Sequence, residues 1–184
     1  MTAADPQPSS AGGCAGCARW IRWVAPCLVA LVTVAAFLPV LDAGFVNWDD
    51  DENFLRNLHY RGLGPQQLRW MVTAYHMGHW TPLTWLTFGL DHNLWGMDPR
   101  GYHLTSLLLH AGAALLFYFL SLRLLRLALP ATTGEPSLRI GAAAAALLFA
   151  VHPLRAESVA GVTERRAVVS GMLYLAAALA YLRA

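Results

Sequence analysis

Four consecutive acidic residues follow the first long apolar stretch of the chain: Asp49, Asp50, Asp51 and Glu52, within FVNWDDDENF at 45–54. Like charges in a row repel one another, so they need either solvent or a cation, proton or hydroxyl as a partner. Carboxylates can bind a divalent cation through oxygen, and one can accept a hydroxyl proton as a general base. A solvated end of the preceding helix is the alternative. Apolar and aromatic neighbours on both sides favour a functional role for Asp49 and Asp50, with Asp51 and Glu52 solvated or capping.

A second group of ionisable residues follows the third apolar stretch: His152, Glu157, Glu164, Arg165 and Arg166. Ionisable residues within a stack of membrane helices are costly and tend to be functional. The guanidinium of Arg165 or Arg166 suits a phosphate or pyrophosphate, because its fixed N–H groups match phosphate oxygens. If a helix begins at Glu157, then Glu157 and Glu164 share one face. The alternative is that these are ordinary loop residues in water.

Histidines and cysteines give weaker signals. His76 and His79 are close enough along the chain to share a ligand, but no HxxxH or HExxH helix accompanies them, and interfacial packing is the favoured interpretation. Cys14 and Cys17 have CxxC spacing without the second pair that a zinc site needs. No phosphate-binding loop, GxSxG elbow or GxGxxG fingerprint occurs in the chain. The sequence assigns no firm metal site, and Asp49 and Asp50 are candidate ligands for a divalent cation.

The composition predicts an all-α membrane protein. Hydrophobic residues make up 57% of the 184 residues and charged residues only 13%, against about 25% charged residues in a typical soluble domain. A spanning helix needs about 20 mostly apolar residues. The expected fold is a polytopic bundle of about four transmembrane or membrane-embedded helices, at 20–41, 104–127, 138–154 and 167–183. The third of these is marginal and is expected to break at His152-Pro153.

The segments outside these helices form a tail and a large loop. Residues 1–18 are rich in Ala, Ser, Gly and Pro and are predicted to be disordered; residues 19–184 form the membrane domain. The loop 42–103 is predicted to contain helices at 65–76 and 82–95, each with proline at its first position. Five of the seven tryptophans lie in this loop. Tryptophan prefers the membrane interface, so both helices are expected to lie along the membrane surface.

The distribution of arginines orients the chain. If the helices alternate, arginines before the first helix, between the second and third and after the fourth fall on one side, which the positive-inside rule assigns to the cytoplasm. The N-terminus is then cytoplasmic, and the loop 42–103 faces outward. A cleaved signal peptide is the alternative for the first helix, but its apolar run is longer than such peptides need. The net charge is +2 and no basic stripe appears, so no nucleic-acid partner is expected.

Three stretches of the chain together resemble one family. They are FVNWDDDENFLRN at 45–57, HWTPLTWLTFGLDHNLWGMDPRGYHLTSLLLH at 79–110 and FAVHPLRAESVAGVTERRAVVSG at 149–171. Their order and spacing resemble the N-terminal membrane domain of bacterial proteins similar to the transmembrane-and-tetratricopeptide-repeat O-mannosyltransferases. That family belongs to the C-type glycosyltransferases, together with the dolichyl-phosphate-mannose protein mannosyltransferases. The resemblance covers roughly residues 37–182.

The resemblance implies an enzyme of the bacterial plasma membrane. Such an enzyme takes a sugar, here expected to be mannose, from a polyprenyl-phosphate carrier and transfers it to a protein or glycan acceptor outside the cytoplasm. Asp49 and Asp50 match the family's acidic pair, which is thought to activate the acceptor hydroxyl, with a metal in related branches. The residues expected to hold the lipid phosphate are His152, Arg165 and Arg166, supported by Glu157 and Glu164.

The chain departs from the family pattern in two respects. The family often has ERKD at the charged segment, whereas this chain has Glu164-Arg165-Arg166-Ala167 and lacks the Asp. The chain also ends inside the fourth apolar segment and contains no 34-residue helical repeat, so it is expected to be a fragment of a longer protein. The alternative function is a non-catalytic membrane anchor or scaffold of a tetratricopeptide-repeat protein.

Overall fold

The computed structural model describes residues 15–46 and 49–183, which are helical with connecting turns. Of the predicted tail at 1–18, residues 1–14 lie outside the described part, and residues 15–18 belong to the first helix. The elements in order are α1 (Ala15–Phe37), η1 (Leu38–Asp42), η2 (Asp51–Leu55), α2 (Pro65–Thr73), α3 (Pro82–Trp95), α4 (Pro99–Ala128), α5 (Glu135–Ala150), α6 (Arg155–Ala160) and α7 (Arg165–Tyr181).

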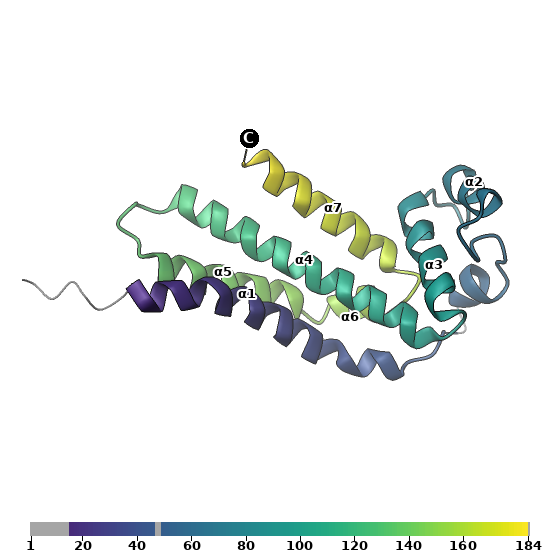
Figure 1. The fold of residues 1–184 in the computed structure, drawn as a ribbon, viewed down its shortest axis with the longest axis horizontal. Coiled ribbons are helices and arrows are strands. Elements are labelled where there is room, and N and C mark those ends of the chain that lie inside the picture. Colours follow the sequence, from purple (N-terminus) through teal and green to yellow (C-terminus); the bar gives the residue numbers. More distant parts are fainter. Residues whose placement is uncertain (1–14, 47–48, 184) are drawn as a thin grey trace, which may run out of the picture.

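The four longest helices form an elongated bundle, with α4 at its centre. Helix α4 packs against α1, α5 and α7, and α1 also packs against α5. Figure 1 shows α2 and α3 together at one end of this bundle, while the α4–α5 connection and the start of α1 lie at the opposite end. The acidic run contacts the segment just before α7, because the Thr163 hydroxyl donates a hydrogen bond to Asp50.

Small side chains allow the helices of the bundle to approach closely. Ala114 of α4 and Ala142, Ala146 and Ala150 of α5 are fully buried in one apolar cluster. Small residues at helix contacts bring backbones together, which is how helices associate in lipid. These alanines therefore form the contact face of α5, within the segment 138–154 that was predicted as a marginal span.

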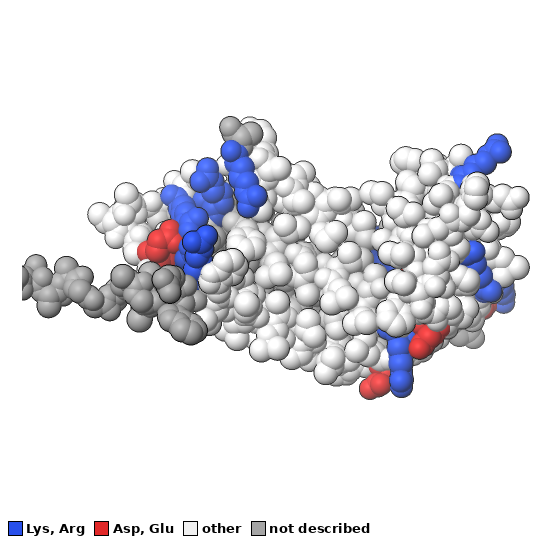
Figure 2. Space-filling model, viewed as in Figure 1, with Lys and Arg blue, Asp and Glu red and all other residues white. Residues whose placement is uncertain are grey.

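Within residues 15–46 and 49–183, two helices are long and apolar enough to cross a membrane. The stretch Arg22–Asp42 has a mean hydropathy of 2.5, and Pro99–Ala128 has a mean hydropathy of 1.7. Helices α5 and α7, with 16 and 17 residues, are shorter than the roughly 20 residues that a span requires. The four predicted spans are thus reduced to two candidates. In the view of Figure 2, charged side chains gather toward the two ends of the molecule, with a largely uncharged body between them.

Helix α3, in the loop 42–103, has an exposed apolar stripe. Helix α3 has the bounds expected from its sequence, and Leu83, Leu86, Leu90 and Leu94 are all exposed. This stripe does not pack inside the protein, so it is available to the membrane interface. Helix α2 ends at Thr73, three residues earlier than predicted, because residues 74–79 turn back on themselves.

A buried ion pair joins three helices. Arg165 at the start of α7 and Asp91 of α3 have side chains that are 0% and 1% exposed, and Nη1 of Arg165 lies 2.6 Å from Oδ2 of Asp91. Arg165 also donates to the Ser106 hydroxyl at 3.0 Å and to the Tyr102 carbonyl at 2.6 Å, both on α4. The Thr105 hydroxyl donates to Oδ1 of Asp91 at 2.6 Å. These contacts hold the start of α7 against α3 and α4.

Replacing Asp91 with Asn should destabilise the protein strongly, because the guanidinium of Arg165 would remain buried without a counter-charge. Breaking one partner of a buried ion pair costs about 3–5 kcal/mol, which lowers the thermal midpoint by roughly 6–20 °C for a chain of this size. The midpoint in detergent measures this effect. The control is Asp42→Asn, which breaks the exposed 3.8 Å pair with Arg100, worth about 0–1 kcal/mol. Equal shifts for both variants would contradict the prediction.

Candidate functional site

Asp50 connects the acidic loop to the charged segment before α7. Its side chain is buried, and Oδ1 accepts a hydrogen bond from the Thr163 hydroxyl at 2.6 Å. Oδ2 accepts from the Val46 backbone N–H at 2.9 Å. A carboxylate that accepts two hydrogen bonds is well stabilised in a buried position. The Asp50 side chain therefore connects the acidic loop to Thr163, in a segment that is distant in sequence.

Asp49 is half-buried and lines a cavity of about 150 Å³. The Asn53 side-chain amide donates to the Asp49 carbonyl at 2.7 Å, which holds this residue at the start of η2. The cavity wall combines one carboxylate, one guanidinium, imidazoles, hydroxyls and aromatic rings. Its lining residues are Asp49, Asn53, His76, Met77, His79, Thr81, Thr84, Trp85, Phe88, Thr163 and Arg166.

A tight turn brings two histidines to this cavity. The backbone N–H of His76 donates to the His79 carbonyl at 3.0 Å, and the N–H of His79 donates back at 2.9 Å. Met77 and Gly78 between them have φ values of 46° and 78°, as in a type I′ turn. A non-glycine residue in this left-handed region costs about 1–2 kcal/mol, so the surrounding structure must hold the turn in place.

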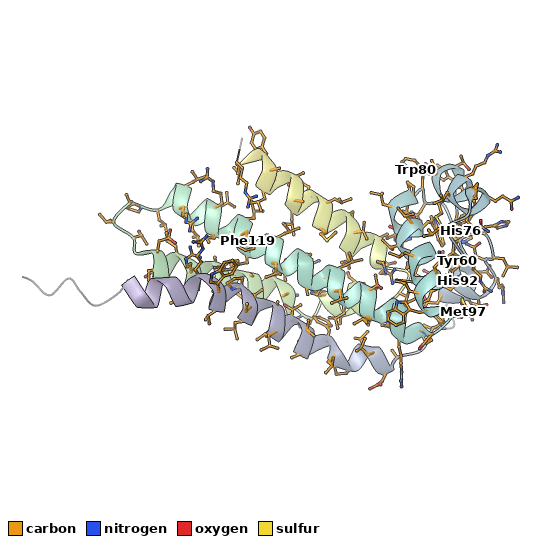
Figure 3. All side chains as sticks on the ribbon, in the orientation of Figure 1. Tyr60, His76, Trp80, His92, Met97 and Phe119 are labelled. Carbon is orange, nitrogen blue, oxygen red and sulfur yellow. The ribbon has the colours of Figure 1, made fainter. Side chains whose placement is uncertain are left out.

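His76 packs between two tryptophans of the loop 42–103. Its ring meets Trp70 and Trp85 edge-on, with centroid distances of 5.8 and 5.4 Å. Figure 3 shows His76 at the α2–α3 end of the molecule, together with Tyr60, His92 and Met97. Burial lowers the pKa of His76 below its ordinary value, an effect that Glu52 partly offsets. The imidazole is therefore neutral near pH 7.

The charged segment contributes Arg166 to the cavity. Its side chain is about one-third exposed, and Nη2 lies 2.6 Å from Oε1 of Glu164. Glu164 thus orients the guanidinium of Arg166, and the side chain of Arg166 stays partly exposed. Of the residues that the sequence assigned to phosphate binding, Arg166 is the one that the structure places in the cavity with Asp49.

The other predicted site residues lie elsewhere. Arg165 belongs to the buried network with Asp91, and its N–H groups face protein atoms. His152 and Glu157 are exposed on the α5–α6 turn and on α6, and neither lines the cavity. Nδ1 of His152 accepts from the Leu154 backbone N–H at 3.2 Å. The sequence-based assignment of Arg165 to phosphate thus conflicts with its burial, since its guanidinium is already engaged within the protein.

An apolar groove continues from the polar cavity along α7. It has a volume of about 430 Å³, and Thr81, Thr84 and Arg166 line both spaces. Beyond Arg166 its wall is largely apolar. The remaining lining residues, from the start of α3 and from α7, are Trp80, Pro82, Leu83, Val169, Ser170 and Leu173.

Within residues 15–46 and 49–183, no group of three or more His, Cys, Asp or Glu side chains is arranged to hold a metal ion. His76 and His79 share the cavity with Asp49, and Asp50 points to Thr163 instead. Cys14 lies outside the described residues.

Sequence reasoning missed several residues of this site. Thr163 and Trp85 were not singled out, and nothing in a single sequence distinguishes them from other loop or helix residues. Asp91 did offer a signal, because it is the one carboxylate in the otherwise largely apolar segment 82–95. A lone charge in such a helix predicts a buried partner, and that partner is Arg165.

Comparisons with known proteins found relatives among curated sequences. Protein O-mannosyl-transferase Tmtc1 of Drosophila melanogaster is 39% identical over 155 residues, which is 80% of this chain and 17% of that protein. TMTC3 of Mus musculus is 32% identical over 167 residues, covering 84% of this chain and 16% of that protein. TMTC4 of Homo sapiens is 31% identical over 174 residues, covering 85% of this chain and 22% of that protein.

The chain is therefore distantly similar, over most of its length, to protein O-mannosyl-transferases, and it spans about a fifth of the length of these relatives. No protein-family model matches it. No solved structure matches it.

The lowered pKa of His76 makes a prediction about pH. A histidine whose pKa is lower in the folded state takes up its proton more readily when unfolded, so its contribution to stability is full above about pH 6.5 and is lost as the pH falls below that value. Acidification from pH 8 to pH 5.5 should therefore lower the thermal midpoint of the wild type more than that of His76→Phe, which keeps a ring between the tryptophans. Identical pH dependence of the two midpoints would refute this assignment.

Proposed function

We propose that this chain is the N-terminal part of an integral-membrane glycosyltransferase. It transfers a sugar, mannose, from a polyprenyl-phosphate carrier to a hydroxyl group of an extracytoplasmic acceptor, such as a protein. The observation that carries the proposal is the cavity in which a carboxylate, Asp49, and a guanidinium, Arg166, face the same space. The distant similarity to protein O-mannosyl-transferases supports the same reaction.

The proposed membrane arrangement follows from charge and length. Helices α1 and α4 cross the bilayer, while α5 and α7 are embedded beside them as the third and fourth helices. Arg123, Arg126 and Arg139 lie at the end of the bundle away from the cavity, and the positive-inside rule places such arginines in the cytoplasm. The cavity then opens outside the cytoplasm, at the level of the membrane interface. In a bacterium this would be the outer side of the plasma membrane.

The two adjoining spaces match the two parts of a lipid-linked donor. Arg166 lies where the polar cavity meets the apolar groove, so its guanidinium can bind the phosphate in a bidentate fashion. The isoprenoid chain would lie in the groove between α3 and α7, which is open to the membrane. The sugar attached to the phosphate would then project into the cavity toward Asp49.

Asp49 is the proposed general base. Its carboxylate accepts the proton of the acceptor hydroxyl as that oxygen forms a bond to the anomeric carbon of the sugar. The bond from the anomeric carbon to the phosphate oxygen breaks at the same time, and polyprenyl phosphate leaves with the electron pair. Arg166 stabilises the negative charge of the leaving phosphate. Asp50 and Arg165 position these two residues from within the fold.

Asp49→Asn should abolish transfer, because the amide cannot accept the proton. The expected loss is about 10²- to 10⁴-fold in rate, measured as the transfer of labelled mannose from polyprenyl-phosphate mannose to a Ser/Thr peptide by the chain in vesicles. The matched control is Asp51→Asn, since Asp51 pairs with the exposed Arg56 and does not line the cavity. Transfer by Asp49→Asn at the wild-type rate, or no transfer by the wild type, would favour the anchor function instead.

Arg166→Ala should weaken binding of the carrier phosphate. Hydrogen bonds to charged groups contribute about 1.5–3 kcal/mol, which corresponds to a loss of roughly 10- to 150-fold in affinity for polyprenyl phosphate. Binding to the chain in nanodiscs measures the effect. Arg100→Ala, a change at an exposed arginine outside both spaces, serves as the control. Equal affinities for the two variants would remove Arg166 from the proposed site.

A further inference from the structure

Two residues that line the cavity each carry a buried polar atom without a hydrogen-bond partner among the described residues. The atoms are the indole Nε1 of Trp85 and the imidazole Nε2 of His76. Trp85 is only 4% exposed, and both residues line the cavity. A buried polar group left unpaired costs free energy, so native proteins rarely retain one without a reason. A polar ligand bound in the cavity would supply the missing partners.

The chemistry of the two atoms defines that ligand. An indole N–H can only donate a hydrogen bond, whereas the nitrogen of a neutral imidazole can donate or accept one, depending on its tautomer. A hydroxyl group both donates and accepts. A ligand with hydroxyls on neighbouring carbons can therefore satisfy both atoms whichever tautomer His76 adopts. A simple anion can do so only if Nε2 carries the proton, and an apolar group cannot do so at all.

The size and walls of the cavity restrict the ligand further. A cavity of about 150 Å³ is of the size that admits a single six-membered ring. Trp85 and Phe88 contribute aromatic rings to the wall, with their centroids 5.7 Å apart and their planes at 67°. One ring bearing several hydroxyls and an apolar C–H face fits such a wall.

The two residues are also held rigidly. His76 is part of the strained turn with Met77, and Trp85 packs edge-on against Trp70 at 5.0 Å. Polar groups fixed in position before binding lose little conformational entropy when a ligand arrives. Unpaired polar atoms that are held in fixed positions are suited to ligand binding. Side chains that only fill space in the core do not need them.

We infer that Trp85 and His76 form a subsite for the single hexose ring of the donor. Trp85 donates to one hydroxyl of the sugar, and His76 bonds a second hydroxyl. The inference rests on the proposed function, but it assigns a role that is separate from the base, Asp49, and from the phosphate ligand, Arg166. Trp85 and His76 thus distinguish a carrier that bears a sugar from a carrier that bears none.

The test compares two ligands that differ only in the hexose: polyprenyl-phosphate mannose and polyprenyl phosphate. Their affinities are measured for the 184-residue chain in nanodiscs. Trp85→Phe keeps an aromatic ring and removes only the N–H. It should weaken binding of polyprenyl-phosphate mannose roughly five- to tenfold and leave binding of polyprenyl phosphate unchanged. His76→Phe should produce the same selective loss, so the result does not depend on the folding of one variant.

The matched control is Trp95→Phe, the same substitution at an exposed tryptophan of α3 that lies outside the cavity. It should change neither affinity. If Trp85→Phe and His76→Phe weaken both ligands equally, or neither, the subsite is overturned while the proposed function stands. If the wild type binds neither ligand, the proposed function itself fails and the subsite fails with it.

Discussion

The burial of one positive charge governs the arrangement of this molecule. A guanidinium can be enclosed by protein only if a counter-charge and hydrogen-bond acceptors surround it, and Arg165 obtains these from Asp91 on α3 and from α4. The start of α7 therefore has a single position relative to those helices. The neighbouring residue Arg166 lines the cavity, and Thr163, two residues before Arg165, donates a hydrogen bond to Asp50. The candidate site is held together by this enclosed charge.

In two pairs of adjacent residues with the same charge, one side chain is buried and the other lines the cavity. Asp50 is buried against Thr163 while Asp49 faces the cavity, and Arg165 is buried against Asp91 while Arg166 faces the cavity. Successive side chains point in different directions from the backbone, so one member of each pair can stabilise the structure while the other lines the cavity. The inner member of each pair supports the outer one, and the two outer members, Asp49 and Arg166, line the same cavity.

The sequence was informative about elements and less so about orientation. Proline at the first position predicted the start of α3, and the apolar runs located the long helices. The pair Asp98-Pro99 also marked the start of α4, where the Asp98 side chain accepts from the Arg100 N–H at 3.0 Å, but the prediction began this helix at residue 104. Acidic and basic clusters identified Asp49 and Arg166 as candidates. Which member of each charged pair lies inside could not be predicted, because it depends on tertiary contacts.

The hydrogen bond between Asp50 and Thr163 links residues that are 113 positions apart. Chains are synthesised from the N-terminus at about 5–20 residues per second, so the carboxylate exists for roughly 6–23 s before its hydroxyl partner is made. Until then the acidic loop lacks the contact that orders it. Closure of this loop thus comes late in biosynthesis, after α7 has begun to emerge, and the cavity is complete only when the last described helix has joined the others.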